Sequence, residues 1–285
     1  MKISELLIKS NEILKSANID SYIIDGQLIL SKVIKKDRIF IITNREHELD
    51  GKTVQEFFRL IEKRKNKMPV KYILNNCEFM GFNFYVKDGV LIPRPDTEIL
   101  VEKTLEEIVK YNYRTVCDLC CGTGAIGLSL AKMIRDIKVD LYDISDIALQ
   151  VTTENISRLD LKNKASVYKS DLLKKAKSTN VKFDVIVSNP PYIKDEVINT
   201  LMDDVKNFEP HIALNGGKDG LDFYRRITLQ AKENLNNNGL LSYEIGHDQK
   251  YEVISILKEN GFTSIRTFQD LAGKDRVVVG RLKEP

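Results

Sequence analysis

The segment Asn189-Pro190-Pro191-Tyr192 carries the residue types best suited to chemistry in this chain. It follows an apolar run, residues 183–188, that is typical of a buried strand. Each proline lacks an N–H and has a fixed φ, so the chain must leave the sheet in a rigid, extended turn. The Asn189 side-chain oxygen and the Pro190 carbonyl can accept hydrogen bonds, and the Tyr192 ring can stack. These groups together suit an amino group on a planar system.

A glycine-containing loop offers a second site for a ligand. It connects an expected strand, residues 116–119, to an expected helix, residues 125–134. Glycines at such a turn let a ligand approach the backbone and the N-terminus of the helix. The loop consists of Cys120, Cys121, Gly122, Thr123 and Gly124.

Two carboxylates follow at positions that suit a nucleoside. Asp143 ends the next expected strand, nineteen residues after Gly124, and can accept both hydroxyls of a ribose. Asp171 comes after the strand that ends at Tyr168 and is placed to reach an adenine amino group. Gly-Thr-Gly alone fits NAD as well as S-adenosylmethionine. Combined with Asn189 at the end of a further strand, it predicts methyl transfer from S-adenosylmethionine at the switch point of a parallel sheet.

The hydrophobic periodicity predicts the elements that must hold these residues. Residues 1–75 have helical spacing, with Ser4 and Asp20 as candidate caps and Pro69 closing a small bundle. Strands and helices alternate within residues 96–285, which predicts an α/β fold with a Rossmann-like parallel sheet covered on both faces. The last two strands have no helix between them and are expected to pair antiparallel. We expect strands at 116–119, 139–142, 165–168, 183–188, 240–245, 264–268 and 277–281, and helices at 96–110, 125–134, 147–159, 222–235 and 250–260.

A β-hairpin is expected between the two domains, within residues 76–95. The apolar runs 82–86 and 90–92 flank Lys87-Asp88-Gly89, and Asp-Gly between apolar runs is a strong hairpin signal. Asp96 or Thr97 can then cap the helix that follows.

Composition limits the class of protein. The chain has 285 residues, of which 42% are hydrophobic and 30% charged, as in a globular protein that can bury a sizeable core. The net charge of +3 permits a polyanionic partner without demanding one. No apolar run approaches the ~18 residues of a membrane span, and the charged N-terminus is unlike a signal peptide. The four cysteines lack the ligand spacing of a zinc site, so we expect buried thiols, no metal and a cytoplasmic location.

Several segments together resemble the protein-glutamine N5-methyltransferases of peptide chain release factors, the HemK/PrmC family. The similarity extends from the helical N-terminus to the last strand, and residues 93–98, Pro-Arg-Pro-Asp-Thr-Glu, are its most specific mark. Asn-Pro-Pro-Tyr alone is shared with amino-methyltransferases of nucleic acids. The matching segments are residues 93–98, 118–125, 188–193, 208–210, 216–225 and 244–246.

The resemblance implies the roles of individual residues. It places the methionine part of S-adenosylmethionine on the loop from Cys120 to Gly124, the ribose on Asp143, and the adenine near Asp171 and Leu172. Asn189 faces both the cofactor and the acceptor. The segment 189–192, with Asn189, Pro190 and Tyr192 as catalytic residues, holds the glutamine amide together with Arg94. The chain departs from the family at Cys120, where glycine is usual, and at Leu172, where an aromatic residue is frequent.

The resemblance also implies the partners. The substrate is the glutamine in the Gly-Gly-Gln loop of release factors, so the enzyme modulates translation termination, and residues 1–75 serve partner recognition. A monomer is expected, without a stable nucleic-acid complex or a membrane. Two alternatives remain: an adenine-N6 methyltransferase of DNA or RNA, which would usually carry a basic and aromatic recognition region, and a non-catalytic nucleotide-binding module.

Overall fold

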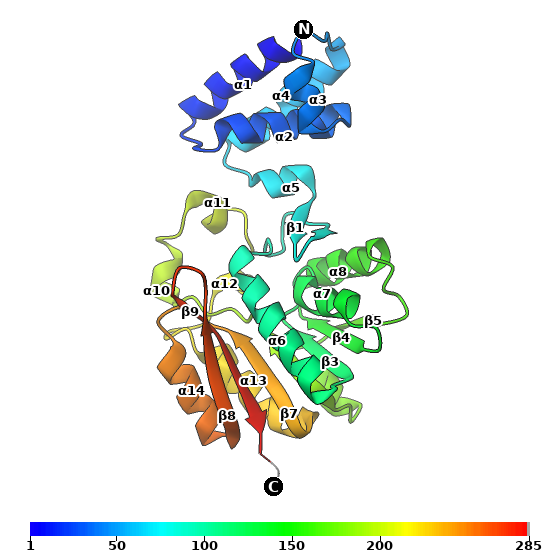
Figure 1. Ribbon diagram of the computed structural model, residues 1–285. Coiled ribbons are helices and arrows are strands. Elements are labelled where there is room, and N and C mark those ends of the chain that lie inside the picture. The colour runs from blue at the N-terminus through cyan, green and yellow to red at the C-terminus, as the bar shows by residue number, and fades with distance from the viewer. Residues whose placement is uncertain (284–285) are drawn as a thin grey trace. The chain divides into compact units, whose positions relative to one another are not determined.

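The computed structural model of the protein describes residues 1–283, except for the side chain of Asp203 (Figure 1). The chain forms two compact units. One consists of Met1–Asn76 and Met202–Phe208, and the other consists of Cys77–Leu201 and the chain from Glu209 onward.

The first unit is helical, as its hydrophobic spacing predicts. Isoleucine and leucine side chains from its helices form a core with Phe57 at its centre. A buried ion pair adds to this core, with Arg64 Nε 2.7 Å from Asp25 Oδ2. The helices are α1 (Ile3–Ser16), α2 (Tyr22–Ile34), α3 (Arg38–Thr43), α4 (Gly51–Lys65), α5 (Val70–Leu74) and α11 (Asp203–Lys206).

The expected boundaries within this unit are partly wrong. The first helix begins at Ile3 with Lys2 in the cap position, so Ser4 lies inside the helix, and the Lys2 N–H donates to the Glu5 carboxylate. Ser21, not Asp20, precedes α2. Pro69 does not end the helical region, because it is the N-cap residue of a further helix, α5. A proline is tolerated there, since the N–H that it lacks would form no hydrogen bond within the helix.

The second unit contains the predicted α/β sheet. Its seven strands lie in the order β5-β4-β3-β6-β7-β9-β8. Neighbours from β5 to β7 are parallel, whereas β9 runs antiparallel to both β7 and β8. The expected antiparallel pair at the end of the sheet is therefore confirmed. The strands are β3 (Thr115–Leu119), β4 (Lys138–Asp143), β5 (Ala165–Lys169), β6 (Phe183–Ser188), β7 (Leu235–Glu244), β8 (Phe262–Gln269) and β9 (Asp275–Leu282).

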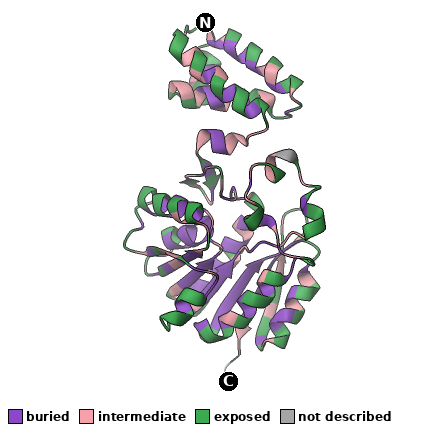
Figure 2. Cartoon of the chain, turned by 180° about the vertical axis from the view of Figure 1, so that it is seen from behind, coloured by how far each residue is buried: buried purple, intermediate pink, exposed green. Residues whose placement is uncertain are grey.

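Helices cover both faces of this sheet, so the central strands β3 and β6 are buried (Figure 2). Successive residues of a strand alternate between two cores: Val116 packs in one and Cys117 in the other. The first core includes residues of α6 (Glu98–Tyr111), α7 (Ala125–Met133) and α8 (Asp146–Arg158). The second includes residues of α9 (Lys174–Ser178), α13 (Asp222–Asn234) and α14 (Lys250–Glu259). Short helices η1 (Pro95–Thr97), α10 (Asp195–Ile198) and α12 (His211–Leu214) complete the unit.

The hairpin turn lies at Met80 and Gly81, earlier in the chain than the predicted turn at Asp88-Gly89. Strand β1 (Cys77–Phe79) pairs with β2 (Phe82–Phe84), and the two residues between them, Met80 and Gly81, have φ values of 52° and 74°. Two successive residues with positive φ are the geometry of a tight hairpin turn. The expected second strand does not form, because Val90 instead packs against Ala148 and Val151 of α8.

Candidate functional site

A cavity of about 330 Å³ opens in the second unit, next to the ends of β3, β4 and β6. These are the carboxyl ends of parallel strands, where ligands of such sheets bind. The residues predicted for the site that line it are Cys120, Gly122, Asp143, Asp171, Leu172, Asn189 and Pro191.

The glycine loop after β3 brings the backbone to the wall of this cavity. Cys120, Gly122 and Gly124 all have positive φ, at 57°, 56° and 76°. Such a backbone favours glycine, so Cys120 occupies a conformation that a non-glycine residue rarely adopts. Cys121 and Thr123 are buried behind the loop. Asn155 Nδ2 donates to the Thr123 carbonyl oxygen at 2.9 Å, which holds the loop against α8.

A buried carboxylate lies beneath this loop. Asp118 of β3 accepts a hydrogen bond from the Gly127 N–H at 2.8 Å through Oδ2, and among the described residues its Oδ1 has no partner. Burial raises the pKa of Asp118 to about 7. A Cβ at Gly127 would lie 2.9 Å from Val139 and 3.0 Å from Asp118, so glycine lets α7 pack closely on the strand.

Asp143 lies at the end of β4, as predicted, with its carboxylate turned to the loop. Its Oδ2 accepts from the Gly122 N–H and its Oδ1 from the Ser145 N–H, both at 2.9 Å. Burial raises the pKa of Asp143, and these two N–H groups oppose that rise. The carboxylate therefore fixes the loop and still presents acceptor lone pairs to the cavity.

Asp171 and Leu172 line the side of the cavity that follows β5. Asp171 forms ion pairs with Lys174 and Arg226, both at 2.7 Å. The Lys174 and Arg226 bonds lower the pKa of Asp171 despite partial burial. The phenyl ring of Phe223 lines the same cavity, so an aromatic residue is present although Leu172 is aliphatic.

Asn189 directly follows β6 and lines the cavity. Its Nδ2 donates to Thr97 Oγ1 at 3.3 Å, which leaves the amide oxygen as the atom that can accept from a ligand. The Tyr192 hydroxyl donates to Glu244 Oε1 at 3.2 Å. Burial is the main cause that raises the pKa of Tyr192, and the charge of the nearby Glu244 raises it further. The Tyr192 hydroxyl therefore stays protonated and neutral. Burial also raises the pKa of Glu244.

Arg94 does not line the cavity but forms an ion pair with Glu209. Its Nη2 is 2.6 Å from Glu209 Oε1, and the Glu209 side chain is 1% exposed, whereas that of Arg94 is 40% exposed. The guanidinium is thus anchored on one side and open to solvent on the other. Pro190 is buried within the acceptor segment.

Sequence reasoning missed several residues of the cavity wall. Phe223 and Arg226 come from α13, and Pro210 lies just before α12. Phe223 and Pro210 lie within residues 216–225 and 208–210, two of the segments that resemble the HemK/PrmC family. That resemblance could have identified them as residues of the site. The other missed residues are Gly89, Val90, Leu91, Tyr142, Ile144, Ser145, Ala148, Ser170, Ile212 and Ala213.

Within residues 1–283, no group of three or more His, Cys, Asp or Glu side chains could hold a metal ion. Cys77, Cys117 and Cys121 are buried, and all four cysteines are free thiols. Over the same residues, no helix is both long and apolar enough to cross a membrane.

Comparison with known proteins gives two family matches. Residues 5–74 match the PrmC N-terminal domain, and residues 95–207 match the methyltransferase small domain. The solved 16S rRNA N2 G1207 methyltransferase of T. thermophilus, in complex with AdoMet and guanosine, shares the fold. Its TM-score is 0.55 and its sequence identity 21%, over 73% of this chain and 50% of that one.

Two curated relatives match almost end to end. The release factor glutamine methyltransferase of Clostridium botulinum is 52% identical over 99% of both chains. That of Clostridium acetobutylicum is 53% identical over 98% of both chains. Both matches span almost the whole chain, so the aligned region includes the helical unit as well as the unit with the cavity. The chain belongs to the release factor glutamine methyltransferase family.

Proposed function

We propose that this enzyme transfers a methyl group from S-adenosylmethionine to the side-chain amide nitrogen of a release factor glutamine. The observation that carries the proposal is the position of Asn189. Its amide is oriented by Thr97 at the rim of a cavity that also contains the Asp143 carboxylate. Asn189, which can accept from an N–H of the substrate, thus lines the same cavity as Asp143, which can accept from the hydroxyls of a ribose.

The residues of the cavity fit S-adenosylmethionine. The cavity volume of about 330 Å³ lies within the ~300–1,000 Å³ typical of sites for ligands of this size. A Cβ at Gly122 would meet no atom within 4 Å, so the loop leaves open space where a cofactor can approach the backbone. Asp143 would accept the ribose hydroxyls, and Leu172 and Phe223 would contact the adenine. The cofactor supplies an electrophilic methyl group on a sulfonium.

The acceptor segment positions the glutamine amide. A carboxamide nitrogen is a poor nucleophile because its lone pair is delocalised. If Asn189 Oδ1 and the Pro190 carbonyl each accept one of its N–H bonds, the nitrogen becomes more pyramidal and its lone pair turns toward the methyl group. Positioning of this kind supplies several kcal/mol, and the two oxygens stabilise the positive charge that develops on nitrogen. The Tyr192 ring packs beside the amide, and Arg94 binds the neighbouring chain of the release factor.

The two units have separate tasks in this proposal. Residues 1–75 recognise the release factor, 76–95 link the units, and 96–285 carry out the chemistry. Every residue assigned to the site comes from one chain, so a monomer suffices, and no nucleic acid has to stay bound. Because release factors act in translation, we place the enzyme in the cytoplasm.

A labelling experiment tests the proposal. The protein is incubated with methyl-labelled S-adenosylmethionine and a release factor, the same factor with its Gly-Gly-Gln glutamine replaced by alanine, or DNA and RNA. Label on the intact release factor alone supports the proposal. Label on adenine in the nucleic acids would support the alternative methyltransferase, and cofactor binding without transfer to any of them would support a non-catalytic module.

A further inference from the structure

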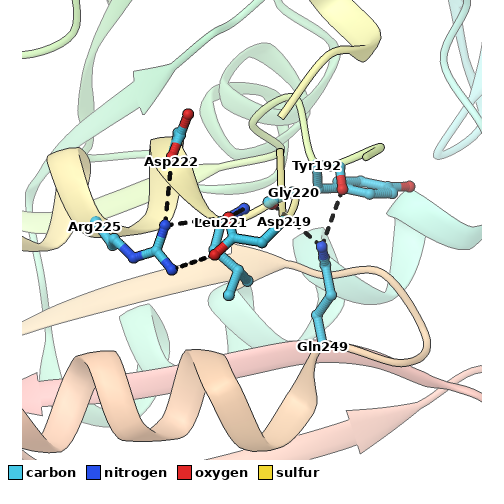
Figure 3. Close-up of polar contacts among 7 residues, drawn as sticks. All are labelled: Tyr192, Asp219, Gly220, Leu221, Asp222, Arg225 and Gln249. Atoms are coloured by element: carbon cyan, nitrogen blue, oxygen red, sulfur yellow. Dashed lines mark hydrogen bonds and ion pairs between the residues drawn. The ribbon is translucent and has the colours of Figure 1, made fainter. Parts of the chain in front are cut away.

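The main chain at Tyr192 is held by one buried amide side chain. Gln249 Nε2 donates to the Tyr192 carbonyl at 3.0 Å and to the Gly220 carbonyl at 3.2 Å. Figure 3 shows this amide between the two backbones. Gln249 lies immediately before α14 and is 4% exposed. It therefore connects the acceptor segment to a turn that is far away in the sequence.

The surroundings of Gln249 decide which end of its amide faces which group. Its Oε1 accepts from the Gly246 N–H at 3.0 Å. The Tyr224 hydroxyl lies 3.4 Å from the same oxygen, but it is closer to the Glu244 carbonyl, to which it donates at 3.0 Å. A backbone N–H thus meets the oxygen, while two carbonyls meet the nitrogen. Only a residue with a donor and an acceptor at the same tip satisfies all three backbone groups. Burial makes an unsatisfied partner expensive, at about 1–3 kcal/mol each.

Glycines allow this close approach. A Cβ at Gly220 would lie 2.4 Å from the Tyr192 carbonyl oxygen and 2.6 Å from Gln249 Nε2. A Cβ at Gly216 would lie 2.7 Å from Tyr192 Cα. The turn is braced from its other side by Arg225, which contacts both Asp219 and Asp222 (Figure 3). The turn and Gln249 therefore enclose the Tyr192 main chain without room for a side chain.

We propose that Gln249 is a positioning residue for methyl transfer, acting through the main chain of Tyr192 on the acceptor segment. The inference rests on the proposed function. Two successive prolines separate Tyr192 from Asn189 and have restricted backbone freedom. Fixing the Tyr192 carbonyl therefore helps to fix the Pro190 carbonyl and the Asn189 amide, which lie two and three residues before it. Gln249 itself touches neither substrate nor cofactor.

The Gln249→Glu variant tests this role because it keeps the size of the side chain and changes only its hydrogen bonding. At about pH 8 the charged carboxylate faces two carbonyls, and we expect kcat to fall by at least ~10-fold, since small misplacements in an active site have large effects. Burial raises the pKa of a glutamate. Toward about pH 6 the protonated carboxyl donates to one carbonyl, and part of the loss should be recovered. Cofactor Kd should stay within about twofold of wild type, since the bonds of Gln249 do not involve the cavity wall.

Gln150→Glu is the matched control, because Gln150 is exposed on α8 and the substitution adds the same charge. It should keep both the wild-type kcat and its pH profile. Hydrogen–deuterium exchange gives a readout without catalysis. In Gln249→Glu, amides of residues 192–195 and 220–221 should exchange faster, while those of residues 120–124 should not.

The outcomes separate the two proposals. Wild-type protein that fails to label a release factor contradicts the proposed function, and the exchange data then decide the role of Gln249 alone. If Gln249→Glu keeps wild-type kcat and exchange, Gln249 is no positioning residue. If kcat, cofactor affinity and melting temperature fall together without recovery at lower pH, its role is general stability and the inference is wrong. Gln249→Asn keeps the amide donor and acceptor on a side chain that is one methylene shorter. If the hydrogen bonds of Gln249 position the acceptor segment, the kcat of Gln249→Asn should exceed that of Gln249→Glu at about pH 8.

Discussion

At the residue scale, the proposal gives different roles to two side chains that line the same cavity. Asp143 ends β4 and Asn189 directly follows β6, and β3 lies between these strands in the sheet. The loop after β3 therefore runs between a carboxylate on one side and an amide on the other. The first is suited to a polyhydroxylated ligand and the second to an N–H donor. Substitutions at the two positions should consequently affect different kinetic quantities.

Asp143→Ala should weaken S-adenosylmethionine binding far more than it weakens the fold. The substitution removes a largely buried carboxylate that also accepts from the Gly122 and Ser145 N–H groups. The loss of the proposed charge-assisted hydrogen bonds from the ribose hydroxyls should cost on the order of 2 kcal/mol of binding free energy. Isothermal titration calorimetry measures the affinity, and thermal melting controls for the fold. An unchanged affinity would rule out the ribose assignment.

Asn189→Ala should reduce catalytic turnover and leave cofactor affinity nearly unchanged. The substitution removes the amide oxygen, while Pro190 and Pro191 still direct the backbone. We expect kcat to fall by at least ~100-fold, as when one preorganised polar group is removed from a transition-state site. Single-turnover kinetics with a release factor provide the measurement. A turnover within a few-fold of wild type would mean that the glutamine amide is held by other groups.

Asp118 should make the stability of the enzyme depend on pH. Its pKa of about 7 in the folded state lies above the unfolded value near 4. The folded state therefore binds the proton more tightly, so this contribution to stability is present at low pH and is lost as pH rises through 7. Asp118→Asn is neutral at every pH, and its oxygen can still accept from Gly127.

Urea unfolding of wild type and Asp118→Asn at about pH 5 and 8 measures this effect. Subtracting the variant removes the contributions of the other titrating groups, which both proteins share. The free energy of unfolding of wild type relative to the variant should fall by about 2–3 kcal/mol between these pH values. Parallel pH profiles would show that Asp118 does not titrate in this range.

At the element scale, the turn between α12 and α13 leaves no room for a side chain at Gly220. Gly220 has a φ of 76°, and a Cβ introduced at this position would collide with the Tyr192 carbonyl and with Gln249. Gly220→Ala should lower kcat strongly, because the turn must move away from the acceptor segment or push it out of place.

Gly273→Ala is the matched control for this prediction. Gly273 also has a φ of 76°, but a Cβ there would meet no atom within 4 Å. Both variants carry the backbone strain of positive φ, whereas only Gly220→Ala adds the collision. Steady-state kinetics of the two variants should therefore differ. Equal kcat values would show that the turn can move without disturbing the acceptor segment.

The elements that could be predicted from the sequence are those with a strong local pattern. Strand β6 has its predicted bounds, and the alternation of strands and helices predicted the parallel sheet correctly. The hairpin was predicted at the wrong turn because Asp88-Gly89 has a turn sequence, but tertiary packing of Val90 on α8 overrides it. Phe223 was missed because only the folded chain brings α13 to the cavity that follows β3 and β4. Long-range placements of this kind, including the bonds of Gln249, have no local signature.

At the scale of the whole molecule, the chain combines two units that have separate hydrophobic cores. The core of the helical unit contains residues from Ile3 to Ile73, and the two cores of the other unit lie on the faces of its sheet. All described residues that line the main cavity belong to the second unit. We therefore expect cofactor binding to need only the second unit and recognition of the protein substrate to draw on both.

A chain that begins at Cys77 should therefore bind S-adenosylmethionine with nearly wild-type affinity and methylate release factor poorly. Calorimetry measures the first quantity, and labelling of intact release factor the second. The segment Met202–Phe208, which groups with the helical unit, remains in the truncated chain and loses its neighbours. Light scattering must therefore show that the shortened protein stays monodisperse. A short glutamine peptide, which offers little surface to the missing helices, should be methylated equally by both chains. Full activity of the truncated chain on intact release factor would contradict a recognition role for residues 1–75.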